Sequence, residues 1–303
     1  MSKGEIKNSI LFVLADGVRI YFSNIDKFVL YMLFPVFGQV IGLVLAFGLT
    51  IGFADKIAQR ATSLSSSLLL IFLLAIPGLL IFIKAFWDYM VAYVALNSMT
   101  EGALTTGKVY DFQSHREVAT RRSFKFIGLL MIVGVLTALG TSIFFIIPGF
   151  VLWIYLILVF QVFTFEHDLT IKECFIRSFN IIKGDWFRTF LLMLILVFFS
   201  MFLITEGVTV IFDYLNLTSF LSHIFDFITN SIPLDNINKV LIHIGRPILT
   251  PEIISYWLFY IVLSCIVAGL TLPLRSICWT LWYANLSELK SLPQEKRARK
   301  EKE

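Results

Sequence analysis

Residues 126–165 read FIGLLMIVGVLTALGTSIFFIIPGFVLWIYLILVFQVFTF and contain no charged side chain. A helix that crosses the hydrocarbon core of a bilayer needs about 20 mostly apolar residues. This stretch is too long for a single tilted span. The sequence Ile147-Pro148-Gly149 inside it is a turn signal. We therefore predict two spans here, at residues 126–145 and 149–165.

The composition of the whole chain is that of a membrane protein. Hydrophobic residues make up 58% of the 303 residues, and charged residues only 15%. Soluble domains contain about 45–50% apolar and about 25% charged residues. Four more apolar segments are long enough to cross a bilayer, at residues 28–53, 68–96, 190–212 and 256–283. The predicted fold is all-α, a polytopic membrane helical bundle of about six transmembrane helices.

The basic residues predict how the chain is oriented in the membrane. Most of the 25 Lys and Arg residues lie in the two tails and in the second and fourth connections between spans. The other connections hold only Lys56, Arg60, Lys239 and Arg246. By the positive-inside rule, both termini are then cytoplasmic. Because the basic clusters flank apolar segments, we expect them to contact anionic lipid headgroups and not nucleic acid.

The sequence also contains an internal repeat. Pro77-Gly78 precedes Ser98-x-x-Glu101, Pro148-Gly149 precedes Thr170-x-x-Glu173, and Pro273 precedes Asn285-x-x-Glu288. The first two endings are capping-box patterns, which predict helix starts. We predict three parallel copies of one unit, a cytoplasmic surface helix followed by a membrane hairpin. The predicted boundaries are one transmembrane domain at 1–290, with repeats at about 5–100, 101–169 and 170–290, and a charged cytoplasmic tail at 291–303.

Two segments are predicted to form amphipathic surface helices, and residues 117–124 form a weaker third. Apolar residues in them recur at helical spacing opposite basic residues. The two apolar faces comprise Ile10, Leu11, Leu14, Val18 and Tyr21 in the first segment, and Ile171, Cys174, Phe175, Phe179 and Ile182 in the other. Such helices either lie in the headgroup plane or pack against the bundle.

A long connection at residues 213–255 mixes apolar and polar residues and contains three Pro. A short helix is predicted to begin near Thr218, with Phe220, Ile224, Phe227 and Ile228 on one face. We expect this connection to rest on the outer membrane surface as a lid or a bundle cap. A ligand-binding role is the alternative.

One motif extends over most of the chain. Its residues are Ile147-Pro148-Gly149, an apolar span, Glu166-His167-Asp168, then Glu173 through Ser178 to Lys183-Gly184-Asp185-Trp186, and an ending from Pro273 to Trp282-Tyr283. This motif resembles that of the YciC-like uncharacterised bacterial inner-membrane proteins and of the membrane domain fused to some glycerophosphodiester phosphodiesterases. Cys174 replaces the Ala usual in those families, and Asn285 replaces an acidic residue. The resemblance implies a location in the bacterial inner membrane.

The roles expected for the motif residues are structural. Gly184 occupies the C-cap region of a surface helix. Trp186 is expected at the membrane interface, with its ring buried and its N–H in contact with water. In the fused proteins the phosphodiesterase chemistry belongs to a separate soluble domain, so the resemblance implies no catalysis here. The structural motif residues are Pro77, Pro148, Gly149, Glu173, Ser178, Lys183, Gly184, Trp186 and Pro273.

A few polar residues within the predicted spans are candidates for function. Lys84 and Asp88 share one helix face, and Arg275 lies in the sixth span. Ionisable groups in a membrane are costly and usually functional. We expect these three to reach the headgroups by snorkelling; the alternative is an ionic cluster around a polar cavity. For Gln39 and Gln161 we expect helix-to-helix hydrogen bonds.

The sequence predicts no enzyme, cofactor or metal site. The four His residues form no zinc motif, and no nucleophile elbow, Walker loop or dinucleotide fingerprint is present. Cys174, Cys265 and Cys278 lack metal-ligand spacing, and we expect them to be small apolar filler without a disulfide. Glu166-His167-Asp168 lies at a span end, where a structural role is expected.

We therefore predict a noncatalytic integral inner-membrane protein that supports envelope or lipid homeostasis or scaffolds membrane proteins. Its expected partners are membrane lipids and other membrane proteins. The alternative is a small transporter or lipid-handling carrier with a polar site in the inner leaflet. A polar cavity that reaches the middle of the membrane would favour the carrier, and a solidly packed interior would count against it.

Overall fold

A computed structural model describes residues 9–60, 63–106, 112–143, 146–166 and 168–291. The structure is 89% helix, and its described residues contain no β-strand. The chain is therefore an all-α polytopic helical bundle, as predicted. His167 lies outside the described residues, and so does the predicted tail at 291–303 except for Ser291.

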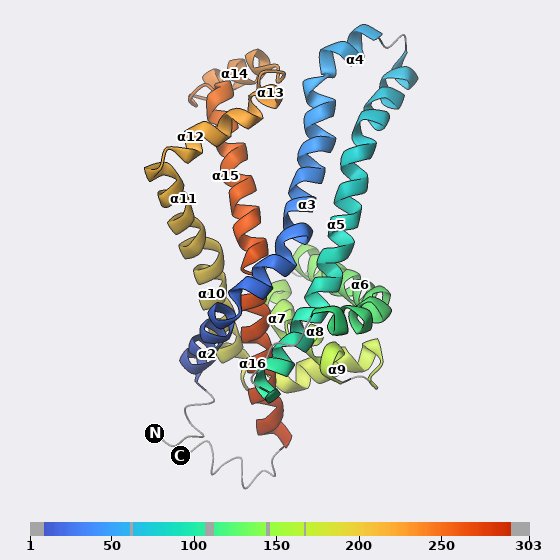
Figure 1. Ribbon diagram of the computed structural model, residues 1–303, viewed down its shortest axis with the longest axis vertical. Coiled ribbons are helices and arrows are strands. Elements are labelled where there is room, and N and C mark those ends of the chain that lie inside the picture. The colour runs from blue at the N-terminus through green and yellow to red at the C-terminus, as the bar shows by residue number, and fades with distance from the viewer. Residues whose placement is uncertain (1–8, 61–62, 107–111, 144–145, 167, 292–303) are drawn as a thin grey trace. The chain divides into compact units, whose positions relative to one another are not determined.

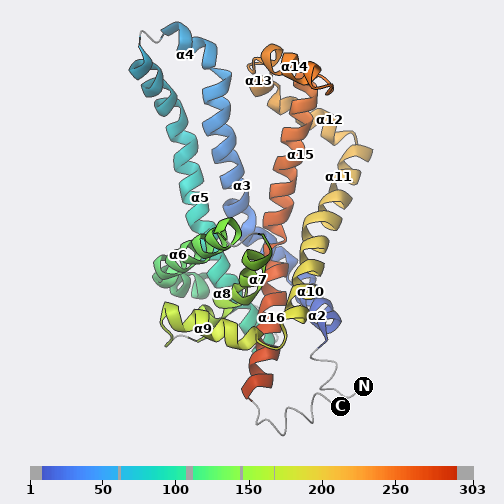
Figure 2. The same cartoon turned by 180° about the vertical axis from the view of Figure 1, so that it is seen from behind.

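The helices follow one another with short connections (Figure 1, and from behind in Figure 2). They are α2 (Ile10–Ser23), α3 (Ile25–Gly52), α4 (Ala54–Arg60), α5 (Leu64–Thr106), α6 (Phe112–Ile143), α7 (Ile146–Leu156), α8 (Val159–Phe165), α9 (Ile171–Ile182), α10 (Trp186–Val197), the π-helix η1 (Phe198–Leu203), α11 (Ile204–Tyr214), α12 (Leu217–Ser222), the 3-10 helix η2 (His223–Phe225), α13 (Asp226–Thr229), α14 (Leu234–His243), α15 (Pro251–Leu270) and α16 (Leu272–Ser291).

Five helical segments of the described chain are long and apolar enough to cross a membrane. They are Ile25–Gly52, Leu64–Asn97, Ile147–Phe165, Trp186–Tyr214 and Pro251–Glu288. The remaining predicted span, at 126–145, corresponds to the shorter apolar stretch Phe124–Gly140 of α6, which has fewer than 18 residues. Five of the six predicted spans are thus long and apolar enough to cross a membrane.

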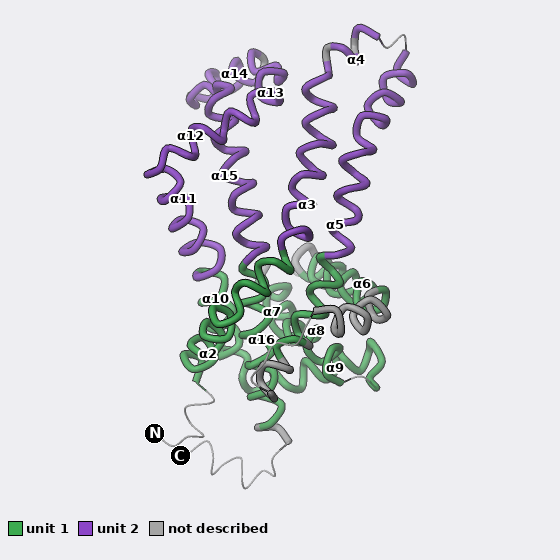
Figure 3. Tube along the Cα trace, viewed as in Figure 1, with its two compact units in different colours: residues 1–32, 89–198, 271–303 green, residues 33–88, 199–270 purple. Residues whose placement is uncertain are grey.

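The chain divides into two compact units, coloured separately in Figure 3. Unit 1 comprises residues 1–32, 89–198 and 271–303, and unit 2 comprises residues 33–88 and 199–270. The boundaries fall inside α3, inside α5, after the first residue of η1, and between α15 and α16. The predicted three-fold repeat stays a prediction.

Within unit 1, α6 and α7 pack against each other as a hairpin. A Cβ added at Gly140 would lie 3.1 Å from Cα of Gly149, so the two backbones approach closely. The predicted turn at 147–149 is wrong in its position, because α7 already begins at Ile146. Pro148 lies in the first turn of that helix, where a missing backbone N–H costs no hydrogen bond.

Helix α2 of unit 1 packs on α16 with a different face from the predicted one. Its buried residues are Val13, Gly17 and Tyr21, and Leu11 is 74% exposed. A Cβ at Gly17 would collide with Sγ of Cys278. Gly17 therefore determines which face of α2 packs on α16, because the absence of a side chain lets the two helices approach closely. Only Tyr21 of the five residues predicted for this face is buried.

The capping box predicted at Thr170 and Glu173 is confirmed. The Thr170 hydroxyl accepts the Glu173 N–H at 3.4 Å, and the Thr170 N–H donates to Glu173 Oε2 at 2.7 Å. The same pattern at Ser98 and Glu101 begins no helix, because α5 runs through it without a break. The Ser98 and Glu101 side chains lie outside the described part, and Asn285-x-x-Glu288 lies near the end of α16.

The α9 face also differs in part from the prediction. Its buried residues are Cys174, Ser178, Ile181 and Ile182, so Cys174 and Ile182 agree with the predicted face. Phe179 instead stacks on the ring of Tyr155 at a centroid distance of 4.4 Å while remaining largely exposed. The predicted weaker surface helix at 117–124 is part of α6, and the side chains of its residues up to 123 lie outside the described part.

Unit 2 contains residues 33–52 of α3 side by side with residues 64–88 of α5 (Figure 1 and Figure 2). The crossing depends on Gly42 and Gly78. A Cβ added at Gly42 would lie 2.6 Å from the Phe82 nitrogen, and one added at Gly78 would collide with the backbone of Ala46. Small residues at a crossing let membrane helices pack backbone to backbone. Pro35 and Pro77 lie inside α3 and α5 without ending either helix.

The other part of unit 2 is formed by α11 and α15, with the segment α12–α14 following the end of α11. Its apolar core is a cluster of Phe225, Phe259, Leu263 and Val267. The predicted apolar face on the connection is divided. Phe220 is 74% and Ile224 is 65% exposed, whereas Phe227 contacts the ring of Phe53 and Ile228 packs against the core cluster. The buried side of the same segment is largely polar and consists of Thr218, Ser222, Phe225 and Thr229.

Candidate functional site

The predicted pair Lys84 and Asp88 forms an ion pair within unit 2. The Lys84 side chain is 57% exposed, and its Nζ lies 5.7 Å from the centroid of the Phe34 ring. An exposed pair at this spacing contributes little to stability. Arg275 belongs to unit 1, so the alternative, a cluster of all three residues, stays a prediction. The exposure of Lys84 agrees with snorkelling.

The two predicted glutamines differ in their hydrogen bonds. Gln39 Nε2 donates to the carbonyl of Pro35 at 2.8 Å, within its own helix and not to a neighbouring one as predicted. Gln161 is fully buried in unit 1, and neither of its amide atoms has a hydrogen-bond partner among the described residues. The Tyr93 hydroxyl interacts with it, but without good hydrogen-bond geometry.

A break in the helix immediately precedes Gln161. Helix α7 ends at Leu156 and α8 begins at Val159, so Ile157 and Leu158 form a turn inside the candidate span Ile147–Phe165. Broken helices at membrane depth occur where a backbone is buried in protein or lines a cavity. The sequence gives no signal for this break, because both turn residues are large and apolar.

A second polar group in unit 1 links three helices. The Ser276 hydroxyl donates to Oδ1 of Asn97 at 2.6 Å, and Asn97 Nδ2 donates to Oγ1 of Thr164 at 3.4 Å. All three residues are buried. The pairing satisfies polar atoms that would otherwise be costly to bury. Sequence reasoning did not identify Asn97 or Ser276.

Several motif residues of unit 1 make contacts between helices, and the structural role expected for Glu166 stays a prediction. Its carboxylate accepts hydrogen bonds from Nε of Arg177 at 2.9 Å and from the Tyr283 hydroxyl at 2.8 Å. The Ser178 hydroxyl donates to the Tyr155 carbonyl at 2.8 Å. These contacts tie the end of α8 to α9 and α16.

At the end of α9, Gly184 lies in the C-cap region as expected from the sequence, but the expectation for the Trp186 N–H is wrong. Lys183 is the C-cap residue, and Gly184 has a φ of +98°, a backbone conformation that favours glycine. The Trp186 N–H is not left to water, because Nε1 donates to the carbonyl of Val151 at 3.4 Å. This carbonyl lies in α7, which the sequence did not place beside Trp186. Pro273 is in the first turn of α16.

The cysteines and acidic residues offer no metal centre. Cys174 and Cys278 are buried and Cys265 is exposed, and all three are free thiols. No group of three or more His, Cys, Asp or Glu within the described ranges could hold a metal ion.

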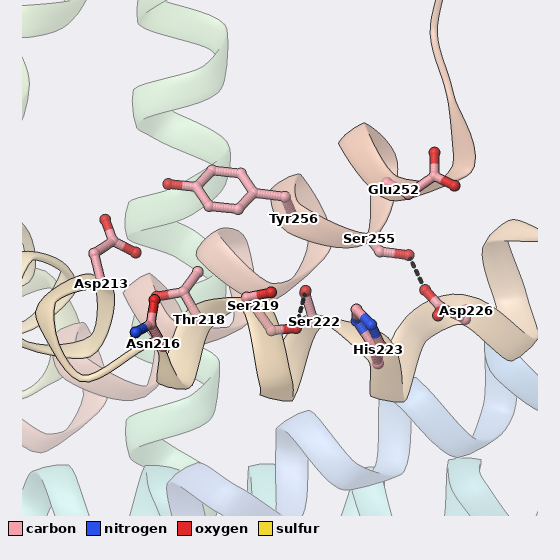
Figure 4. Close-up of a pocket in the computed structure, with 10 residues that line it drawn as sticks. All are labelled: Asp213, Asn216, Thr218, Ser219, Ser222, His223, Asp226, Glu252, Ser255 and Tyr256. Atoms are coloured by element: carbon pink, nitrogen blue, oxygen red, sulfur yellow. Dashed lines mark hydrogen bonds between the residues drawn. The ribbon is translucent and has the colours of Figure 1, made fainter.

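A cavity lies in unit 2, at the end of α11 and the start of α15 (Figure 4). Its volume is about 380 Å³. The residues that line it are Asp213, Asn216, Thr218, Ser219, Ser222, His223, Asp226, Glu252, Ser255 and Tyr256. We refer to it as the cap pocket, because its wall is the polar side of the segment α12–α13.

Hydrogen bonds fix one wall of the cap pocket. The Ser255 hydroxyl donates to Oδ1 of Asp226 at 2.8 Å, and the hydroxyls of Ser255 and Thr229 lie 2.9 Å apart. These bonds join α13 to the first turn of α15. They occupy one oxygen of the Asp226 carboxylate. The Thr218 hydroxyl oxygen is buried and has no hydrogen-bond partner among the described residues.

The cap pocket has a negative electrostatic character. Three of its ten described lining residues are carboxylates and none is Lys or Arg. The sequence predicted a helix near Thr218 but not this pocket, because its walls come from two segments, 213–226 and 252–256, with 25 residues between them. Each carboxylate alone looks like an ordinary residue at a helix end.

Comparisons of the chain with protein families, with curated proteins and with solved structures give no match.

Proposed function

We propose that this protein is a noncatalytic inner-membrane protein that binds phospholipid and serves lipid or envelope homeostasis. The observation that carries the proposal is the inverted polarity of the α12–α13 segment. Phe220, Ile224 and Phe227 are exposed, while Thr218, Ser222 and Thr229 are buried. A water-exposed cap would have the opposite arrangement.

The inverted polarity suits a segment that rests in the membrane interface. An amphipathic segment there buries its apolar face about 5–10 Å into the boundary between headgroups and acyl chains. The exposed aromatic and aliphatic side chains then contact acyl chains, while the cap pocket behind them faces the headgroup layer. Contact with both parts of one lipid molecule supports a lipid-binding role.

The orientation that we propose follows from the basic residues and from helix pairing. Helices α6 and α7 form a hairpin, so together they add either two crossings or none. The number of crossings is then even, which agrees with two cytoplasmic termini. The connection at 213–255 lies on the opposite, outer side of the membrane in this topology.

Lipid retention tests the proposal. Full-length protein is purified in mild detergent, and its bound phospholipids are counted by native mass spectrometry. We expect the variant Phe220→Ser/Ile224→Ser/Phe227→Ser to retain fewer lipids than the wild type, since each substitution removes apolar contact area. The control Leu68→Ser/Leu69→Ser/Phe72→Ser alters equally exposed residues of α5. Equal retention by the wild type and both variants would contradict lipid binding at the cap.

A second candidate, a small lipid-handling carrier, is favoured by one observation. The buried amide of Gln161 makes no well-formed hydrogen bond within the described residues, and it follows a break in the helix, as in transporters. In proteoliposomes, a carrier transfers a fluorescent lipid between leaflets, and Gln161→Leu abolishes that transfer. Absence of transfer by the wild type would leave the noncatalytic function.

A further inference from the structure

We propose that the cap pocket binds an ammonium group, offered by the headgroup of an aminophospholipid or by a small free amine. This inference names the ligand class of the site on which the proposed function rests. It stands on the charge of the pocket, its size, an unsatisfied buried hydroxyl and an aromatic wall.

The charge of the pocket favours a cation. Asp213, Asp226 and Glu252 line it, and none of the ten described lining residues is Lys or Arg. Asp226 is half-buried, whereas Asp213 and Glu252 are exposed, so the attraction for a cation exceeds that in bulk water chiefly at Asp226. The bond from Ser255 holds the Asp226 carboxylate in place, so this acceptor is oriented before any ligand arrives.

The arrangement suits an organic cation better than a metal ion. A metal needs several ligands around one point, and no such group of His, Cys, Asp and Glu exists among the described residues. The carboxylates are instead spread around about 380 Å³, within the range of small-molecule pockets. Tyr256 adds an aromatic ring, whose face attracts ammonium groups.

A polar ligand would also account for Thr218. This residue is 4% exposed, lines the pocket, and has a buried hydroxyl oxygen without a partner among the described residues. A buried hydroxyl without a hydrogen bond is destabilising. The hydroxyl oxygen is closed off from solvent, so a donor or a polar headgroup atom in the pocket supplies the missing bond when the Thr218 side chain rotates toward it.

Competition between two lipids tests the inference. Purified full-length protein is mixed with equal amounts of phosphatidylethanolamine and phosphatidylglycerol in micelles, and bound lipids are counted by native mass spectrometry. We expect wild type to retain the ethanolamine lipid over the glycerol lipid by about threefold or more, as a single exposed ion pair can supply. The triple variant Asp213→Asn/Asp226→Asn/Glu252→Gln is expected to bring the ratio to about one. The control Asp235→Asn removes an acidic residue of α14 that does not line the pocket.

A second arm separates the two sources of the ammonium group. Free ethanolamine is titrated by calorimetry, with uncharged ethylene glycol as its control. Binding of ethanolamine without any lipid retention supports the ammonium site and overturns the lipid-binding function. Equal retention of both lipids without ethanolamine binding overturns the ammonium site and leaves the lipid-binding function intact. If the triple variant fails to fold, Glu252→Gln alone is expected to lower the wild-type preference.

Discussion

The Tyr283 hydroxyl donates a hydrogen bond of 2.8 Å to Oε1 of Glu166, a residue 117 positions earlier in the chain. The single N–H at Nε of Arg177 donates a bifurcated hydrogen bond to the two oxygens of the same carboxylate, at 2.9 and 3.2 Å. The Tyr283 ring also stacks on Phe165 at a centroid distance of 5.4 Å. One acidic residue at the end of α8 thus holds both α9 and α16.

The variant Tyr283→Phe is expected to lower the stability of unit 1. It removes the hydrogen bond to Glu166 but keeps the ring and its stacking. Hydrogen bonds to charged groups contribute about 1.5–3 kcal/mol, and partial exposure of the Glu166 carboxylate reduces this to about 1 kcal/mol. Thermal unfolding in detergent measures the change in Tm. Asp168→Asn is the control, because Asp168 is exposed, and an equal loss in both variants would contradict a specific role for this bond.

Replacing the glycine at the α3–α5 crossing is expected to destabilise unit 2. A Cβ at Gly78 would collide with the backbone of Ala46, which cannot move aside as a side chain would. Overpacking of this kind costs about 1–3 kcal/mol. We therefore expect Gly78→Ala to unfold at a lower SDS fraction by circular dichroism. Gly207→Ala serves as control, since its Cβ would meet no atom within 4 Å and Ala is the better helix former. Matching shifts in both variants would exclude a steric cause.

The sequence predicts features that depend on a few consecutive residues and misses those that depend on distant pairs. The Thr170–Glu173 capping box needs only four residues and is correct. The same pattern at Ser98 fails, because apolar packing extends α5 past it. The hydrogen bond between Ser276 and Asn97 joins residues 179 positions apart. The residues next to each of them in the sequence do not predict it.

The same limit explains the cap pocket. The periodicity near Thr218 predicted a helix with four apolar residues on one face. Of these, Phe220, Ile224 and Phe227 are exposed, whereas Ile228 packs against the apolar core. The periodicity could not tell which side is exposed, because that depends on α15, which supplies Ser255 and Glu252. In a membrane protein an apolar face can be directed either to protein or to lipid, so hydrophobicity alone does not decide the direction.

The capping box predicts a pH dependence in acid. The Thr170 N–H and hydroxyl lower the pKa of Glu173 from 4.5 by donating hydrogen bonds to its carboxylate. A carboxyl whose pKa is lower in the folded state stabilises above its unfolded pKa, and this contribution is lost as pH falls through the folded pKa. We expect the Tm advantage of wild type over Glu173→Gln to be present at pH 7 and to disappear below 4.5. A difference in Tm that stays constant across this range would show that the charge of Glu173 is irrelevant.

The buried amide of Gln161 makes opposite predictions for the two candidate functions. A buried amide without hydrogen bonds costs about 1–3 kcal/mol, so Gln161→Leu is expected to raise Tm. Gln39→Leu is the matched control, because Gln39 bonds to the Pro35 carbonyl and its loss brings no gain. A noncatalytic protein gains stability from Gln161→Leu and keeps its lipid retention. A carrier gains the same stability but loses lipid transfer, because strained or unsatisfied polar groups persist where function requires them. A fall in Tm for Gln161→Leu would mean that the amide is satisfied in the folded protein, and the carrier would then lose the observation that favours it.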